Sequence, residues 1–188
     1  MSKFPFLTTD RLTLRNFVES DVPAVYAIFS EESVAEFYDI DAFSSLDQAK
    51  SMVASRMRRN EKQDGTWFRW AICLSTNPEV VIGSCGFHST NEDFHSIQIG
   101  YELHPQYWGK GIAFEAVSTM LKFCFESHFP FHVNWVAATT DLDSQRSIKL
   151  LRRLGFSEEG ILRQFGFWKD KFQDVRLFSL LRTEWEAK

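Results

Sequence analysis

The sequence predicts one α/β (α+β) domain over residues 1–188, with a mixed, mostly antiparallel sheet of about seven strands and helices on both faces. Its 188 residues, 44% of them hydrophobic, suit a single domain with a well-filled core. Three β-rich segments follow one another between residues 67 and 103, a succession typical of an antiparallel meander. A helix, a strand, a second helix and two late strands come after them, so helices and strands share one sheet.

The N-terminal third of the chain predicts one strand and two helices. Residues 12–17 alternate between apolar and polar side chains, which indicates a strand. A short helix is expected to begin at Asp21, with Pro23 in its first turn. Ser45 and Gln48 form a possible capping box for a second helix. The apolar face of that helix consists of Ala49, Met52, Val53, Arg56 and Met57.

Strands dominate the middle of the chain, and Asn77-Pro78 is expected to separate the first two of them. An apolar stripe at helical spacing predicts a long helix from Ile112 to about Phe125. Gly155 is expected to end a shorter helix. The expected segments are strands 67–74, 80–87, 96–103, 133–140, 156–168 and 172–181 and helices 112–125 and 144–154.

Charge and cysteine content disfavour several classes of protein. A net charge of −4 gives no basic footprint, so direct binding to nucleic acid is not expected. Cys73, Cys85 and Cys124 are odd in number and form no CxxC pair, which argues against a disulfide framework and a metal site. No apolar run approaches the roughly 18 residues that span a membrane, and no signal-peptide pattern is seen. A cytoplasmic monomer or homodimer is expected.

The loop Gln106-Tyr107-Trp108-Gly109-Lys110-Gly111 follows a predicted strand and opens a predicted helix. The first amides of a helix have no partner inside it, and the helix dipole adds positive potential there. Two glycines let the backbone close around a bulky anion such as a pyrophosphate, and Lys110 adds a charge. The alternative is that the glycines only shape the turn. The spacing fits neither the phosphate loop of NTPases nor the Rossmann fingerprint.

The pattern Gln106-x-x-Gly109-x-Gly111 resembles the Arg/Gln-x-x-Gly-x-Gly/Ala coenzyme A signature of the GNAT superfamily of N-acetyltransferases. Further segments resemble the branch that acetylates ribosomal-protein N-termini, so the resemblance covers nearly the whole chain. These segments are residues 7–12, 99–105, 154–156 and 177–182.

The resemblance implies acetyl-CoA as the cofactor and a sheet that splays between its fourth and fifth strands, here residues 96–103 and 133–140. The pantetheine arm would lie in that gap, near the backbone of Leu103, and the pyrophosphate would meet the amides that follow Tyr107. The residues that the resemblance assigns to the cofactor are Leu103, Gln106, Trp108, Gly109, Lys110, Gly111, Ile112, Ala113 and Ser144; it implies no metal.

Direct attack by an amine needs an acid that protonates the departing thiolate. Other branches of the superfamily use a Tyr at the position of Leu151, which cannot serve. The ribosomal branch carries Asn-x-x-Ser at the start of this helix, and here Ser144 replaces the Asn while Ser147 is kept. Ser147 is the candidate acid; its alternative is an ordinary first-turn serine. Ser144 either contacts the pantetheine or caps the helix.

The general base is assigned by elimination. Gln98 stands where many relatives carry Glu, and an amide cannot act as a base. Glu102 lies beside the expected acyl site on the same strand face as Gln98, so it is the candidate base; its alternative is a structural salt bridge. His88 is a candidate for the acceptor site, as are the aromatic rings of Phe37 and Tyr38, although plain core or surface roles suit all three.

These features predict an acetyl-CoA-dependent N-acetyltransferase. The acceptor is expected to be a primary amine, with the N-terminal amine of a ribosomal protein favoured by the branch resemblance. A small-molecule amine such as a polyamine, an amino acid or an aminoglycoside is the first alternative. A non-catalytic acyl-CoA sensor is the second, because of Ser144 and Gln98.

Overall fold

The computed structural model describes residues 4–62, 67–126 and 129–187. The strands and helices follow one another in the order that the sequence predicts, with short elements added at both ends and between the predicted ones. The elements are β1 (Leu7–Thr8), β2 (Leu12–Arg15), η1 (Glu19–Asp21), α1 (Val22–Phe29), α2 (Glu32–Ala35), α3 (Leu46–Lys62), β3 (Phe68–Leu74), β4 (Asn77–Asn91), β5 (Ser96–Leu103), η2 (Pro105–Tyr107), α4 (Ile112–Phe125), β6 (Trp135–Asp141), α5 (Gln145–Leu154), β7 (Ser157–Trp168), β8 (Lys171–Leu181) and α6 (Arg182–Glu186).

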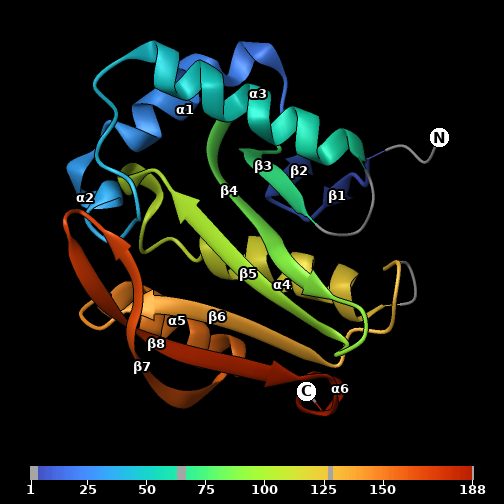
Figure 1. Ribbon diagram of the computed structural model, residues 1–188. Helices are drawn as coiled ribbons and strands as arrows, with labels where there is room; N and C mark the ends of the chain where they lie inside the picture. The colour runs from blue at the N-terminus through green and yellow to red at the C-terminus, as the bar shows by residue number, and fades with distance from the viewer. Residues whose placement is uncertain (1–3, 63–66, 127–128, 188) are drawn as a thin grey trace.

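The strands form one sheet in the order β1-β2-β3-β4-β5-β6-β8-β7 (Figure 1). Every neighbouring pair is antiparallel except β5 and β6, which are parallel, so the mixed, mostly antiparallel sheet is confirmed. The described residues hold eight strands rather than about seven. The added strand, β1, is two residues long and pairs Leu7 with Leu14. Two residues are too few to show the alternation by which a strand is predicted.

The expected splay lies between β5 and β6. Pairing of the two strands covers only Ser96–Ile99 with Trp135–Ala138, and β5 then continues to Leu103 without this neighbour. The gap opens toward η2 and the start of α4. Figure 1 shows the two strands diverging at that end.

Helices cover both faces of the sheet, as predicted, because successive strand residues point to opposite sides. In β3, Trp70 packs in one hydrophobic cluster with residues of α4 and α5, whereas Ala71 packs in a second cluster with residues of α1 and α3. In Figure 1, α4 and α5 lie behind the strands, and α1 and α3 run side by side near β3 and β4. The splay therefore has a face toward α4 and α5 and a face toward α1, α2 and α3.

Three local expectations need correction. Asp21 does not cap α1 with its side chain; its carboxylate accepts a hydrogen bond from the amide of Val18 and pairs with Arg15. Asn77-Pro78 begins β4 instead of breaking the meander, since proline is tolerated at the start of a strand. Gln48 accepts hydrogen bonds from the amides of Ser44 and Ser45, which is one half of a capping box.

Candidate functional site

The glycine loop joins the end of β5 to the start of α4. Gly109 and Gly111 adopt the left-handed conformation, with φ of 73° and 75°, and Gly111 is the residue immediately before α4. A Cβ on Gly109 would meet no atom within 4 Å, so backbone conformation rather than space requires glycine there. The turn places the first amides of the 14-residue helix α4 at the open end of the gap between β5 and β6.

The first turn of α4 offers free donors. The amide of Glu115 donates to the carbonyl of Gly111, which closes the first helical hydrogen bond. The amides of Ile112, Ala113 and Phe114 precede it and so have no partner inside the helix. Together with the helix dipole they form a positive end that suits a phosphate group.

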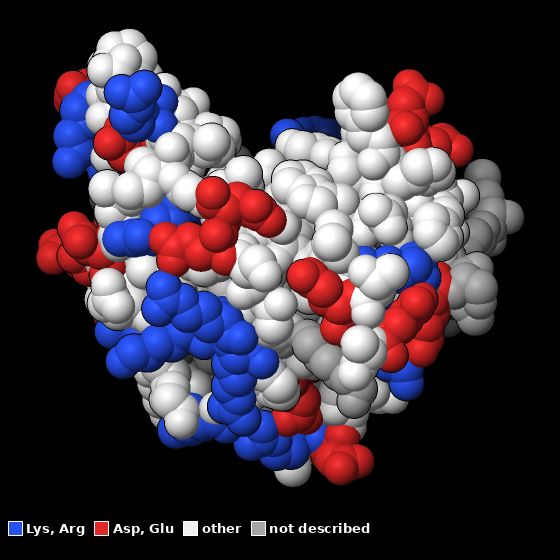
Figure 2. Space-filling view, turned by 90° about the horizontal axis from the view of Figure 1, so that it is seen from below, with Lys and Arg blue, Asp and Glu red and all other residues white. Residues whose placement is uncertain are grey.

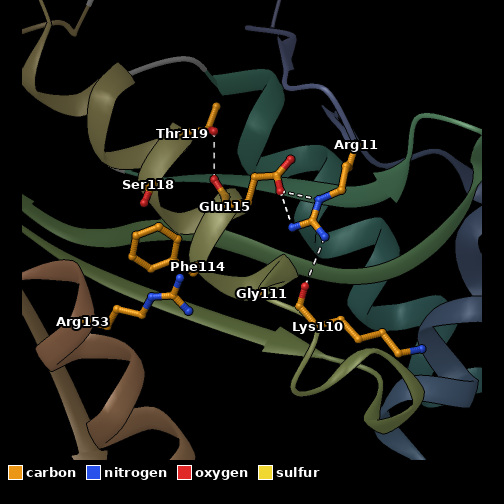
Figure 3. Close-up of a pocket in the computed structure, with 8 residues that line it drawn as sticks. All are labelled: Arg11, Lys110, Gly111, Phe114, Glu115, Ser118, Thr119 and Arg153. Carbon is orange, nitrogen blue, oxygen red and sulfur yellow. Dashed lines mark hydrogen bonds and ion pairs between the residues drawn. The ribbon is translucent and has the colours of Figure 1, made fainter.

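A pocket of about 580 Å³ adjoins this loop (Figure 3). Three cations from separate segments surround it: Arg11 before β2, Lys110 in the loop and Arg153 on α5. Arg11 pairs with Glu115 at 2.5 Å and donates to the carbonyl of Lys110 at 3.2 Å, which fixes the N-terminal segment against the loop. The guanidinium of Arg153 lies over the ring of Phe114, 4.3 Å from its centroid. The remaining lining residues are Gly111, Ser118 and Thr119.

A wider basic band extends from this pocket over α5. The exposed cations of this helix are Arg146, Lys149, Arg152 and Arg153. Figure 2, seen from below, shows Lys and Arg gathered in a band on the face where α5 lies in Figure 1. The band provides positive potential on this face although the whole chain carries a net charge of −4.

Trp108 connects the loop to both sides of the splay. Its indole Nε1 donates a hydrogen bond to the carbonyl of Leu103 at 2.7 Å. The guanidinium of Arg146, at the start of α5, lies 3.9 Å from the centroid of the Trp108 ring, a close cation–π contact. Gln106 is exposed in the loop, and its backbone N–H donates a hydrogen bond to Nδ1 of His104.

Ser147 lies on the α4/α5 face of the splay. Its Oγ is 2.6 Å from the phenolic oxygen of Tyr101 on β5. Burial raises the pKa of Tyr101, so the phenol stays protonated at neutral pH. Ser144 is buried immediately before α5, but its side chain makes no capping hydrogen bond.

Glu102 lies on the opposite face, among groups that hold it as an anion. It pairs with Arg56 at 3.1 Å and with Arg69, and it accepts hydrogen bonds from Tyr38 at 2.7 Å and from Ser84. Burial alone would raise the pKa of Glu102, but the two arginines and these hydrogen bonds lower it to about 2. Such a carboxylate is a weak base, so the geometry favours the structural salt bridge that the sequence left open as the alternative.

Two of the acceptor candidates, His88 and Tyr38, lie on this same face, toward α1, α2 and α3. His88 is opposite Gln98 in the β4–β5 ladder, and Gly100 follows two residues later on β5. Burial, followed by the charge of Arg69, lowers the pKa of His88, so its imidazole is neutral at pH 7. The hydroxyl of Tyr38 donates a hydrogen bond to Glu102. Phe37, the preceding residue in the chain, is half-buried.

The cysteines take no part in this arrangement. All three are free and buried. Burial raises the pKa of Cys85 to about 12 and that of Cys73 to about 11, so neither is a thiolate at neutral pH. Cys73 in β3 and Cys85 in β4 are core residues of strands.

Sequence reasoning missed three residues of the site: Tyr101, Arg69 and Arg153. Tyr101 lies in a strand of alternating apolar residues, where an aromatic side chain is easily read as part of the core. Arg69 lies in a β-rich run, where a single cation is easily taken for a solvent-facing residue. A signal was present in Arg56, because a cation on the apolar face of a helix indicates a buried ion pair.

A strand, a glycine turn and a helix N-terminus beside a splayed sheet form a site that suits an anionic, extended ligand. The sequence-family model of the acetyltransferase (GNAT) domain matches residues 11–157 of this chain, and the chain belongs to this family. It is therefore an acyltransferase, an N-acetyltransferase of the GNAT family. The residues that the structure describes contain neither a helix able to cross a membrane nor a group of three or more potential metal ligands.

Two curated relatives resemble the chain over nearly its whole length, and one solved structure shares its fold. It is 31% identical to the uncharacterized N-acetyltransferase YoaA of Bacillus subtilis, over 95% of this chain and 98% of that protein. It is 27% identical to the [ribosomal protein uS5]-alanine N-acetyltransferase of Escherichia coli, over 95% and 92% of the two chains. The structure of RimL, a ribosomal L7/L12 α-N-protein acetyltransferase in complex with coenzyme A, superposes with a TM-score of 0.79 at 19% identity, covering 94% of this chain and 98% of that one.

Proposed function

We propose that this protein transfers the acetyl group of acetyl-CoA directly to a primary amine, most suitably the N-terminal amine of a protein. The observation that carries the proposal is the position of Gly111, in the left-handed conformation at the start of α4 beside the gap between β5 and β6. An extended cofactor with a pyrophosphate at its centre fits both features at once.

The residues of this chain fit coenzyme A along its length. Amides at the start of α4, including those of Ile112 and Ala113, would hold the pyrophosphate, and Lys110 would add its charge. The pocket between Arg11 and Arg153 would take further phosphate at the adenosine end. Gln106 and Trp108 would border the cofactor on the outer side of the loop.

The gap beyond Ile99 would hold the pantetheine arm as an added strand. The amide of His104 donates to Ile82 on β4, so by alternation the amide of Leu103 points away from β4, into the gap. The carbonyl of Leu103 is already taken by Trp108, which leaves its amide as the group for the arm. The hydroxyl of Ser144, which caps no amide, would line the far side of the gap.

The cofactor supplies an activated thioester; the side chains would manage the two protons of the reaction. Ser147, with Tyr101 behind it, would donate the proton that the departing sulfur needs. On the opposite face, neutral His88 would accept the proton of the incoming ammonium, directly or through water. Glu102, with its low pKa, would hold Arg56 and Arg69 in place instead of acting as the base.

A protein N-terminus is favoured as the acceptor because relatives that acetylate ribosomal proteins match over most of both chains. Tyr38, on the acceptor face, and Phe37, next to it in the chain, would then contact the first residues of that protein. A small-molecule amine is the second candidate. The experiment is thiol release from acetyl-CoA with ribosomal N-terminal peptides, amino acids, polyamines and aminoglycosides. Release with a peptide supports the proposal, whereas tight binding of acetyl-CoA without release by any amine indicates a sensor.

A further inference from the structure

Arg69 lies on the acceptor face and uses two of its three guanidinium nitrogens for hydrogen bonds within the described part of the chain. Its Nε donates to Ser84 at 2.7 Å, and its Nη2 donates to Tyr38 at 3.2 Å and to Glu102. Its Nη1 donates to no acceptor in the described part of the chain, although the side chain is only 11% exposed. An arginine held rigidly on two of its nitrogens presents the third in a fixed direction.

The unused nitrogen reaches solvent beside Gly100. Among the described residues, no side-chain nitrogen or oxygen is both sealed from solvent and without a partner, so Nη1 must be accessible. A Cβ added to Gly100 would lie 3.4 Å from Nη1 of Arg69 and 3.7 Å from Cε1 of His88. Nη1 of Arg69 and the imidazole of His88 thus border the same small space beside Gly100. Gly100 is the first residue of β5 after its pairing with β6 ends at Ile99.

The buried charges beside this space do not cancel. Arg56 and Arg69 face one carboxylate, that of Glu102, which leaves one formal positive charge in excess. Arg56 is enclosed, with its guanidinium 5.0 Å and 5.4 Å from two phenylalanine ring centroids. Tyr38 and His88 are neutral at pH 7, and Asp39, whose charge acts on His88, is exposed. A partly buried positive excess favours an anion and repels a second cation.

We propose that the acceptor carries a carboxylate a few bonds from its reactive amine, and that Nη1 of Arg69 binds this carboxylate while the amine lies beside His88. The inference rests on the proposed function and narrows its substrate class. Two sources share this chemistry: the α-carboxylate of a free amino acid and the side chain of an acidic first residue in a protein. Polyamines are excluded, because their second cation would lie next to Arg69.

The test compares acceptors that differ only in this charge. One pair is an amino acid and its amide, and the other is a pair of C-terminally amidated peptides that begin with Asp or Asn. Values of kcat/KM are corrected for the fraction of neutral amine. A preference of about tenfold or more for the charged member of one pair is expected, from a charge-assisted hydrogen bond. The pair that shows it identifies the source of the carboxylate.

Two variants assign the preference to Arg69. Gly100→Ala covers Nη1 without altering any charge, and Arg69→Lys keeps the charge but removes the directed N–H; both should reduce the preference to less than threefold. Arg58→Met, an exposed position on α3, is the control and should keep it. Far-UV circular dichroism checks that each variant is folded.

The outcomes separate this inference from the proposed function. Equal rates for acid and amide, or faster turnover of polyamines, would overturn the inference and leave the enzyme an acetyltransferase. If no amine is turned over, the proposed function fails, and calorimetric binding of N-acetylated acid and amide in the presence of coenzyme A still decides the inference. Equal binding of the two would overturn it.

Discussion

The hydroxyl of Ser147 and the phenol of Tyr101 lie 2.6 Å apart across the splay, although they are 46 residues apart in the chain. Tyr101 comes from β5 and Ser147 from the first turn of α5, so the contact spans the gap proposed for the cofactor. The pair places a proton donor on one face of the gap, and His88 and Arg69 border the other.

Replacing Ser147 with Ala is expected to lower kcat about 100-fold, the smaller end of what a positioned general acid contributes, with little change in the affinity for acetyl-CoA. Tyr101→Phe should lower kcat less, because Ser147 keeps its hydroxyl. Steady-state rates and calorimetry give the two quantities. Ser157→Ala, an exposed serine at the start of β7, is the control. An unchanged kcat in Ser147→Ala would remove this residue as the acid.

Gly111→Val is expected to weaken coenzyme A binding by more than tenfold. A β-branched residue is disfavoured at a φ of 75°, so the turn would shift and misdirect the amides at the start of α4. Gly160→Val is the matched control, because Gly160 also has a positive φ, of 149°, and lies on β7 away from the loop. Calorimetry measures both variants, and an equal loss of affinity in the two would contradict the role of the loop.

Arg153→Gln is expected to weaken coenzyme A binding several-fold, and the difference from the unmodified protein should shrink as salt rises from low to physiological ionic strength. The reason is that Arg153 lines the pocket next to the glycine loop. Lys149→Gln on the same helix removes an equal charge outside the pocket lining and should have a smaller effect. Titrations at two salt concentrations decide; equal effects of the two variants would assign the attraction to the whole basic band.

Glu102→Gln is expected to lower the free energy of unfolding by about 3 to 5 kcal/mol, because it leaves two buried arginines without their shared anion. The folded-state pKa of Glu102, about 2, lies below the ordinary 4.5. Its contribution is therefore fully present above pH 4.5 and is lost as the pH falls toward 2. Urea unfolding at several pH values should show the two proteins converging over that range. Glu61→Gln, exposed on α3, should show no such change.

His88→Gln is expected to move the acid limb of the pH–rate profile up to the higher pKa of the acceptor amine. Burial and Arg69 lower the pKa of His88, so the unmodified enzyme should keep its rate down to a pH below 6.5 and lose it as the imidazole is protonated. The variant should be slower at pH 7, with a rate that follows only the neutral fraction of the acceptor amine. Retention of the same acid limb in His88→Gln would assign the titration to another group.

The sequence by itself determined the strands, the long helix after the glycine loop and the loop's place between them. These features follow from local properties: alternation in residues 96–103, the apolar stripe of α4, and glycines where the backbone needs a positive φ. The family resemblance rests on the same local patterns, so the sequence alone is enough to detect it. The parallel pairing that ends at Ile99 confirmed the splay that the resemblance implied.

Only the tertiary structure decided which side chains meet. The role of Glu102 depended on Arg56 from α3 and Arg69 from β3, and the partner of Ser147 came from a strand on the far side of the gap. Arg69 and Glu102 are 33 residues apart, and Tyr101 and Ser147 are 46 residues apart, so neither pair has a common local signal. Whether a carboxylate is a base or a structural anion is set by burial and neighbouring charge, which arise only when distant segments pack together.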